Sequence, residues 1–219
     1  MARAAKAYRG MGMEGSTARW YDRTTRKALA DFKALADRIA ALLPPGAEIL
    51  EIAPGPGFLS IELAKRGFHV RGVDISKSFV VIARKNAAAE CVNVPFEQGN
   101  ASALSLGDAS VDFVVCRAAF KNFAEPVKAL AEMRRVLKPG GMALVIDMRR
   151  DISLAEVRQY VKAQDVSFIN RWFMMFVFRH MLIKRAYTLE AMRKMALDAG
   201  WVAPRVELAP FGFEAWLTR

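Results

Sequence analysis

Apolar residues recur along the chain in two alternating patterns. The first is a spacing of three and four residues over positions 28–43, which predicts a helix with one apolar face. The second is a continuous apolar run over positions 48–53, directly before a turn of prolines and glycines, which predicts a buried strand. The alternation continues to position 150. Further helices are expected at 58–66, 76–89 and 125–137, and further strands at 69–74, 94–99, 111–116 and 142–148.

Strands that alternate with helices predict βαβ units and a parallel sheet. The strands are apolar on both faces, as expected when helices cover both sides of the sheet. After Arg150 the alternation breaks, and positions 151–187 resemble two helices of an inserted segment. A capped helix at 188–199 and a hairpin at 201–208 and 212–218 then close the chain. We therefore expect an α/β fold: a doubly wound, Rossmann-like sheet of seven mostly parallel strands, with a helical lid inserted after strand five.

No repeat or linker composition divides the chain, so we expect one domain over residues 1–219. We expect it to have four parts, which are a helical arm at 1–43, a ligand-binding core at 44–150, the lid insert at 151–187, and a closing helix and hairpin at 188–219.

Composition excludes several classes of protein. The chain is 53% apolar, too much for a disordered protein. Cys91 and Cys116 form no CxxC pair, and the sequence has no metal-ligand cluster, so neither a disulfide framework nor a metal site is expected. The longest apolar run, at 172–178, falls short of the about 18 residues that a membrane span needs. Because no export signal is visible either, we expect a cytoplasmic protein without a transmembrane segment.

The net charge is unusual, because 33 basic and 22 acidic residues give +11. Positions 1–27 hold seven basic and two acidic residues, and positions 171–185 hold four basic residues and no acid. Two short segments therefore carry +9 of the total. Such local charge indicates an anionic partner, which could be a nucleic acid, a membrane surface or an acidic small molecule.

The loop after the first strand is the candidate ligand site, since ligands of such sheets bind at the carboxyl ends of the strands. It reads EIAPGPG from Glu51 to Gly57, and its glycines permit a close backbone approach. Asp74 ends the second strand, where a carboxylate can accept both hydroxyls of a ribose. The G-x-G-x-x-G spacing of dinucleotide sites is absent, and two prolines remove N–H groups that a pyrophosphate needs. A nucleoside ligand without phosphates fits better.

Four stretches resemble the motifs of class I S-adenosylmethionine-dependent methyltransferases. ILEIAPGPGFLSIELAKRG resembles motif I, and VRGVDIS resembles the acidic end of strand two. The later motifs resemble two further parts of the chain, which are EQGNASAL with DASVDFVVCRAAFKNF, and EMRRVLKPGGMALVIDM. The resemblance covers about residues 45–150 and is nearest to the small-molecule branch of ubiquinone and menaquinone methyltransferases. Two departures are Ala53 in place of the first glycine and Asn100 in place of an aspartate.

The resemblance implies S-adenosyl-L-methionine as the cofactor and S-adenosyl-L-homocysteine as the product. It implies that Asp74 holds the ribose hydroxyls, that Ile75 stacks on adenine, and that Asn100 meets the adenine edge. The full set of cofactor contacts that it implies is Glu51, Ala53, Pro54, Gly55, Gly57, Asp74, Ile75, Asn100, Ala101 and Arg117.

The reaction expected from this resemblance is an in-line methyl transfer to a small acceptor, for which the protein supplies geometry and a dry site. If the acceptor needs a base, the candidates are His180, in the insert, and Tyr21, which matches an aromatic residue near the methyl group in similar enzymes. The insert is apolar around a whole helix and has basic flanks, which suits an acceptor with an apolar body and an anionic end. The acceptor contacts that we expect are Arg171, Phe176, Arg179 and Arg185.

Other readings remain open at this point. The insert could instead form a homodimer interface. The charge could serve an RNA methyltransferase, although the sequence has no appended RNA-binding module and no N-P-P-Y-type loop after strand four. The chain could also be a non-enzymatic cofactor-binding or membrane-associated protein that uses the insert as an interfacial helix. The sequence does not identify the acceptor or the atom that is methylated.

Overall fold

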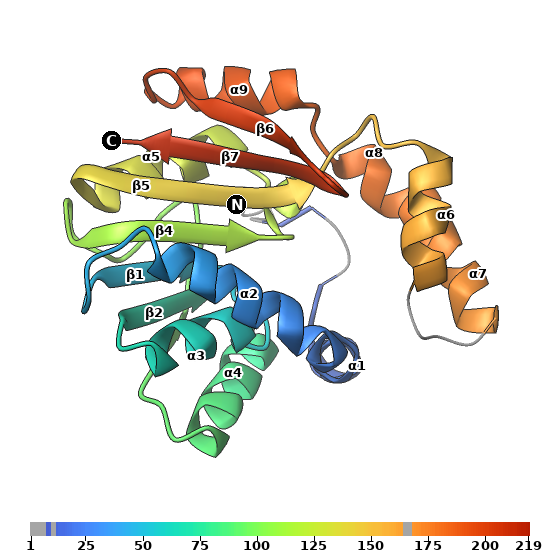
Figure 1. Cartoon of the computed structure of the whole chain (residues 1–219), viewed down its shortest axis with the longest axis horizontal. Coiled ribbons are helices and arrows are strands. Elements are labelled where there is room, and N and C mark those ends of the chain that lie inside the picture. Colours follow the sequence, from blue (N-terminus) through green and yellow to red (C-terminus); the bar gives the residue numbers. More distant parts are fainter. Residues whose placement is uncertain (1–7, 10–11, 164–167) are drawn as a thin grey trace, which may run out of the picture.

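A computed structural model describes residues 8–9, 12–163 and 168–219. Its sheet has seven strands in the order β3-β2-β1-β4-β5-β7-β6 (Figure 1). The strands are β1 (Glu48–Ile52), β2 (His69–Asp74), β3 (Phe96–Gln98), β4 (Val111–Arg117), β5 (Leu137–Met148), β6 (Arg205–Ala209) and β7 (Gly212–Thr218). The pairs among β1 to β5 are parallel, whereas β7 is antiparallel to β5 and to β6. This arrangement confirms the expected doubly wound, mostly parallel sheet.

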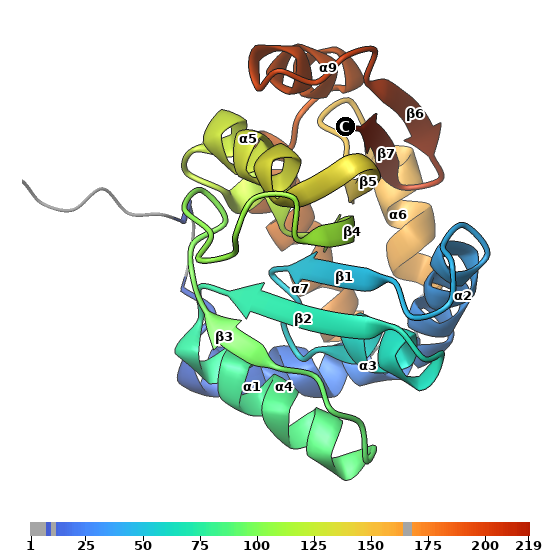
Figure 2. The same cartoon turned by 90° about the vertical axis from the view of Figure 1, so that its left-hand side faces the viewer.

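Helices cover both faces of the sheet (Figure 2). One face packs against α2 (Leu29–Ala40), α3 (Phe58–Lys65) and α4 (Lys77–Ala89), and the other against α5 (Pro126–Val136) and α9 (Leu189–Asp198). Side chains of a strand alternate between the two faces. In β1, Ile49 joins the core under α2 to α4, while Leu50 joins the core under α5 and α9. Both sides of the sheet are therefore dry, which explains the uninterrupted apolar strands.

The helix signals of the sequence act as expected. Ser76 caps α4 by accepting a hydrogen bond from the Phe79 N–H at 3.1 Å, and Thr188 caps α9 in the same way from the Ala191 N–H. Three strands differ clearly from expectation, and one of them is β6, which begins at Arg205 instead of Trp201. Strand β3 is shorter than 94–99, and β5 begins at Leu137 instead of Met142. Strand β5 is longer because Leu137 already pairs with Val111, before a bulge in the register.

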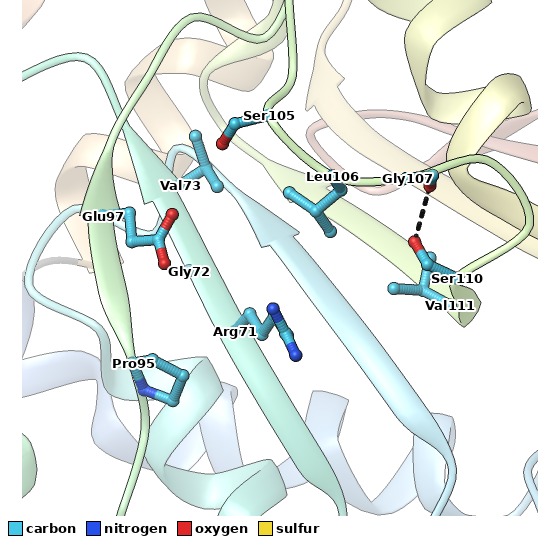
Figure 3. Close-up of a pocket in the computed structure, with 10 residues that line it drawn as sticks. All are labelled: Arg71, Gly72, Val73, Pro95, Glu97, Ser105, Leu106, Gly107, Ser110 and Val111. Carbon is cyan, nitrogen blue, oxygen red and sulfur yellow. Dashed lines mark hydrogen bonds between the residues drawn. The ribbon is translucent and has the colours of Figure 1, made fainter.

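The connection between β3 and β4, residues 99–110, forms no helix in the structure. Arg135 on α5 holds this connection by donating to the carbonyl oxygens of Leu104 and Leu106. A cavity of about 240 Å³ lies between the connection and strands β2 and β3, and Arg71 and Glu97 are among the residues that line it (Figure 3). It contacts the middle of β2 and the start of β4, away from the carboxyl ends where such folds bind ligands.

Helical segments follow β5, as the sequence predicts. They are α6 (Leu154–Ala163), α7 (Phe168–Val177), a π-helical turn η3 (Phe178–Leu182) and α8 (Ile183–Arg185). They lie beyond the ends of β4 and β5 (Figure 1) and form a small apolar cluster of their own around Val157 and Val161. The arm before α2 consists of α1 (Gly15–Thr25) and the turn η1 (Arg26–Ala28). Among the described residues, no helix is long and apolar enough to cross a membrane.

Candidate active site

The loop after β1 makes a tight turn that depends on left-handed backbone. Ala53, Gly55 and Gly57 have φ angles of 55°, 56° and 82°. A Cβ atom on Gly57 would lie 2.8 Å from the Phe96 ring, so only glycine fits there. At Gly55 a Cβ atom would only touch the Tyr21 ring, at 3.9 Å, so this position is not crowded. Ala53 adopts the conformation of the glycine that it replaces, and the turn survives the substitution.

Asp74 joins the ends of β1 and β2. Its buried carboxylate accepts hydrogen bonds from the backbone N–H of Gly55 at 3.0 Å and of Ser76 at 2.9 Å. Burial raises the pKa of Asp74, and these two N–H groups oppose that rise. The structure thus brings together the loop and the acidic strand end that the sequence singled out.

Glu51 lies under the same loop, with 3% of the residue exposed. Its carboxyl group accepts a hydrogen bond from the Ser60 hydroxyl on α3. Burial raises the pKa of Glu51 to about 7, although the Ser60 hydrogen bond and Arg117 oppose this rise. The group therefore titrates near neutral pH, at a position where a cationic ligand would favour its ionised form.

The parallel strands β1, β2 and β3 end at one edge of the sheet, and we use the word cleft for the candidate ligand site at this edge. Residues that follow β2 and β3 belong to it. The backbone oxygen of Ile75 accepts a hydrogen bond from the Gln98 side chain at 3.1 Å, and the Ile75 side chain is partly exposed. Asn100 uses its side-chain oxygen to accept from the Ser102 N–H at 3.0 Å, and Ala101 packs against the core. Because that oxygen is already engaged, the amide N–H₂ is the part of Asn100 best able to meet a ligand.

Arg117 ends β4, and its guanidinium lies 4.4 Å from the centroid of the Phe32 ring on α2. Its side chain is therefore committed to packing, which leaves its backbone for the ligand. The next residue, Ala118, has a φ of 59°, and its N–H donates to the Ile146 carbonyl at 2.7 Å. A second strained alanine thus sits at the carboxyl end of the neighbouring strand.

Tyr21 on α1 lies against the β1 loop, since its ring is the nearest group to the Gly55 position. It also packs edge-on against Phe79, with 5.7 Å between ring centroids. Pro54 and Pro56 are buried in the loop below. The predicted aromatic of the arm and the predicted loop are therefore neighbours.

Asn86 connects the arm to the loop, a role that no sequence pattern indicated. Its side-chain N–H₂ donates to the Pro56 carbonyl at 2.9 Å and to the Asp22 carboxylate at 3.0 Å. Its oxygen accepts from Arg26 at 2.8 Å. One amide thus links α1, η1, α4 and the loop.

The chain before α1 borders the cleft at two points. Near β2, the Glu14 carboxylate accepts from the N–H groups of Lys77 and Ser78, both at 3.0 Å, at the start of α4. Near β4, the Arg9 N–H donates to the Asn122 carbonyl at 2.7 Å. Tyr8 lies beside Arg9, and burial raises its pKa while Arg185 opposes the rise.

A polar cluster follows β4 and β5. Lys121 and Asp147 form an ion pair of 2.8 Å, with 7% and 1% of their side chains exposed. In the described part of the chain, the Asn122 side-chain oxygen and the Tyr187 hydroxyl are buried without a hydrogen-bond partner. The Tyr187 pKa is raised by burial, and Arg9 opposes the rise, so Arg9 lies near both groups. Unpaired buried polar atoms indicate a place where water or a ligand binds.

The structure separates the predicted acceptor residues. Arg185 on α8 is close enough to Tyr8 to influence its pKa. Phe176 and Arg179 instead line a groove of about 330 Å³ between α6 and α7, and Arg171 is half-buried on α7. His180 belongs to the turn η3, but its side chain lies outside what the structure describes. No group of three His, Cys, Asp or Glu residues able to hold a metal occurs among the described residues.

Sequence patterns did not predict the polar cluster after β4 and β5, which consists of Lys121, Asp147, Asn122 and Tyr187. An Asp inside the apolar strand MALVIDM is the one signal that could have drawn attention to the ion pair. Asn122 and Tyr187 are ordinary residues in irregular segments, and only the fold places them near Arg9.

The structure has a glycine-dependent loop after β1, an acidic end of β2 bonded to it, and an antiparallel β7 beside β5. These features agree with the fold and site that the resemblance to class I S-adenosylmethionine-dependent methyltransferases implies. Residues 50–145 match the family model of the methyltransferase domain. The resemblance stated from the sequence motifs is therefore confirmed.

Two relatives and one solved structure illustrate the similarity. A demethylmenaquinone methyltransferase of Deinococcus radiodurans is 40% identical over 101 residues, which is 45% of this chain and 42% of that protein. A ubiquinone biosynthesis O-methyltransferase of Hahella chejuensis is 32% identical over 128 residues, which is 56% of this chain and 53% of that protein. The chain thus spans about half the length of the curated relatives that it matches.

A crystal structure from Methanococcus maripaludis, described as an S-adenosyl-L-methionine-dependent methyltransferase, covers 96% of this chain and 95% of its own, with a TM-score of 0.77. Its sequence identity is 21%, so it supports the fold alone.

Proposed function

We propose that this protein transfers a methyl group from S-adenosylmethionine to a small, largely apolar acceptor that carries an anionic group. The observation that carries the proposal is the hydrogen bond from Gly55 to Asp74, which fixes the loop and the ribose-type carboxylate in one cleft of a methyltransferase domain. The bound cofactor would supply an activated methyl group for in-line displacement, and S-adenosylhomocysteine would leave.

The residues around the cleft suit this cofactor. Asp74 would accept hydrogen bonds from the ribose hydroxyls, and Ile75, Asn100 and Ala101 would border adenine. Glu51 would attract the ammonium group from beneath the loop. The remaining contacts that we propose are the backbone or apolar atoms of Ala53, Pro54, Gly55, Gly57 and Arg117.

The cofactor side of the proposal is tested by calorimetry with S-adenosylhomocysteine. Asp74→Ala should weaken binding at least about tenfold, because hydrogen bonds to a charged group contribute about 1.5–3 kcal/mol. Asp112→Ala is the matched control. Asp112 also accepts a backbone N–H, that of Glu48 at 2.9 Å, but lies at the start of β4. Equal binding by wild type and Asp74→Ala would refute the assignment.

The acceptor would bind between the ends of β4 and β5 and the helices after β5. Arg185 and Arg9 would hold its anionic group, while the Asn122 oxygen and the Tyr187 hydroxyl would bind its polar substituents. Arg171, which is half-buried on α7, would border the apolar body farther out. The names of two relatives support this class of acceptor, since quinone precursors combine an apolar body with oxygen substituents. The same relatives do not favour RNA as the acceptor.

In the catalytic step the chain would mainly orient the acceptor and exclude water. Tyr21 would contact the reacting region from α1, and His180 remains the proposed base of the insert. Asp147 is already bound to Lys121, so it is a poor base and a good anchor for the strand end. Incubation with labelled S-adenosylmethionine and a set of quinone precursors, with and without Tyr21→Phe, tests this step. The variant should lose turnover while S-adenosylhomocysteine binding changes little.

A further inference from the structure

Two large aromatic side chains on α7 face solvent. Trp172 is 69% exposed and Phe176 is 48% exposed, and their rings stack with 6.3 Å between centroids. We call these two residues the aromatic ridge. Leu154 on α6 is 38% exposed, and it lines the groove between α6 and α7 together with the aromatic ridge. Large apolar side chains gathered on one surface mark a place where another apolar phase or partner binds.

Positive charge surrounds the aromatic ridge. Arg158 on α6 and Arg179 on η3 are exposed and line the groove together with the ridge. The groove has no acidic residue among its described lining residues, and the sequence from 168 to 185 contains none. A surface with aromatic centre and cationic edges complements the boundary between acyl chains and anionic headgroups.

We propose that the helices α6 and α7 dock on an anionic lipid surface through the aromatic ridge, with Arg158 and Arg179 against the phosphates. Trp172 suits this place because an indole is apolar in body and polar at one edge. The contact is peripheral, since no described helix is long and apolar enough to cross a membrane. The inference goes beyond the proposed function and does not depend on methyl transfer.

A second copy of the chain is a poorer occupant of this face. In a twofold dimer the same surface meets itself, so Arg158 and Arg179 would face their own copies. Without acidic residues in the groove, the charges would repel across the interface. A lipid surface supplies the opposite charge instead.

The test is cosedimentation of the full chain with vesicles of phosphatidylcholine alone or mixed with phosphatidylglycerol. We expect binding to the mixed vesicles only, and weaker binding at high salt. Trp172→Ser with Phe176→Ser should lower the partition coefficient at least about tenfold. The control is Val202→Ser with Leu208→Ser, which removes two residues that are 80% and 66% exposed elsewhere.

Charge is tested separately. Arg158→Glu with Arg179→Glu should weaken vesicle binding by more than the about fivefold expected for each lost cation. Lys33→Glu with Lys85→Glu, on α2 and α4, makes the same change in net charge and should have a smaller effect. Calorimetry with S-adenosylhomocysteine should give wild-type affinity for all four variants, which shows that each one folds.

Three results would overturn the proposal. The first is absence of binding to the mixed vesicles. The second is equal binding by the ridge variant and its control. The third is a stable dimer in sedimentation velocity that the ridge substitutions dissolve, without vesicle binding, because the ridge would then be a protein interface.

Discussion

At the carboxyl ends of β1 and β4, Ala53 and Ala118 hold φ angles of 55° and 59°. A left-handed conformation costs a non-glycine residue about 1–2 kcal/mol. Such strain persists where the surrounding structure enforces it, and both residues border the cleft. The shape of the site is therefore set by neighbouring contacts, such as the hydrogen bond from the Ala53 N–H to the Val73 carbonyl at 2.8 Å.

Ala53→Gly should raise the free energy of unfolding by about 1 kcal/mol, because glycine adopts this backbone without the steric conflict. Urea unfolding measures the change. Ala30→Gly, in the exposed part of α2, should have the opposite sign, since glycine weakens a helix by about 0.5–1 kcal/mol. A loss of stability in Ala53→Gly would contradict the claim that the backbone at Ala53 is strained.

Glu51 makes stability depend on pH. Its pKa of about 7 in the fold lies above the ordinary value of 4.5, so the folded state holds its proton more tightly than the unfolded state. The associated stability is complete below pH 4.5 and is lost as the pH rises towards 7, by up to about 3 kcal/mol.

Glu51→Gln should abolish this loss, and unfolding at pH 5 and pH 8 measures it. Glu62→Gln is the control, and it should leave the difference in stability between pH 5 and pH 8 unchanged. Although burial opposes it, bonds from Arg66 and Lys65 lower the Glu62 pKa, so that carboxylate stabilises the fold above its ordinary pKa. An unchanged pH dependence in Glu51→Gln would refute the assignment.

Among the elements, α4 connects the most parts of the site. Its first turn binds Glu14, and its last turns carry Asn86, which bonds the β1 loop, α1 and η1. The N-terminal arm is therefore fixed to α4 and to the β1 loop, although it lies outside the matched residues 50–145.

Asn86→Ala should lower the free energy of unfolding by about 1–3 kcal/mol, because the buried Pro56 carbonyl loses its donor. It should also weaken S-adenosylhomocysteine binding several-fold, because the loop is held less firmly. Denaturation and calorimetry measure the two effects. Asn93→Ala, at an exposed position after α4, should change neither. Normal binding by a destabilised Asn86→Ala would show that the loop keeps its shape without this amide.

Sequence patterns predicted the elements well where local chemistry decides them. Ser76 and Thr188 cap helices because the capping bond spans three residues, and the β1 loop is recognisable from its glycines. The extra length of β5 was not predictable, because Leu137 joins the sheet only by pairing with Val111. The bonds of Asn86 join residues 22, 26, 56 and 86, and no local pattern encodes such distant contacts.

At the scale of the whole molecule, most of the net charge of +11 comes from two segments that are far apart in the sequence, positions 1–27 and 171–185. Arg9 comes from the start of the chain and Arg185 from the helices after β5, yet both lie near tyrosines of one cleft. Asp74 and Asp147 also raise the pKa of Tyr8, so Tyr8 lies between the carboxyl ends of β2 and β5. The fold thus gathers charge from distant segments around one place.

This convergence predicts how the enzyme selects its acceptor. Arg185→Gln should raise KM at least about tenfold for an alkylated hydroxybenzoic acid, because a charged hydrogen bond of about 1.5–3 kcal/mol is lost. The neutral amide of the same acid should show no such difference, and kcat should change little. Lys33→Gln, exposed on α2, is the control for general electrostatics. If KM rises equally for the acid and the amide, Arg185 affects only the shape of the site. The site then does not recognise the anionic group of the acceptor.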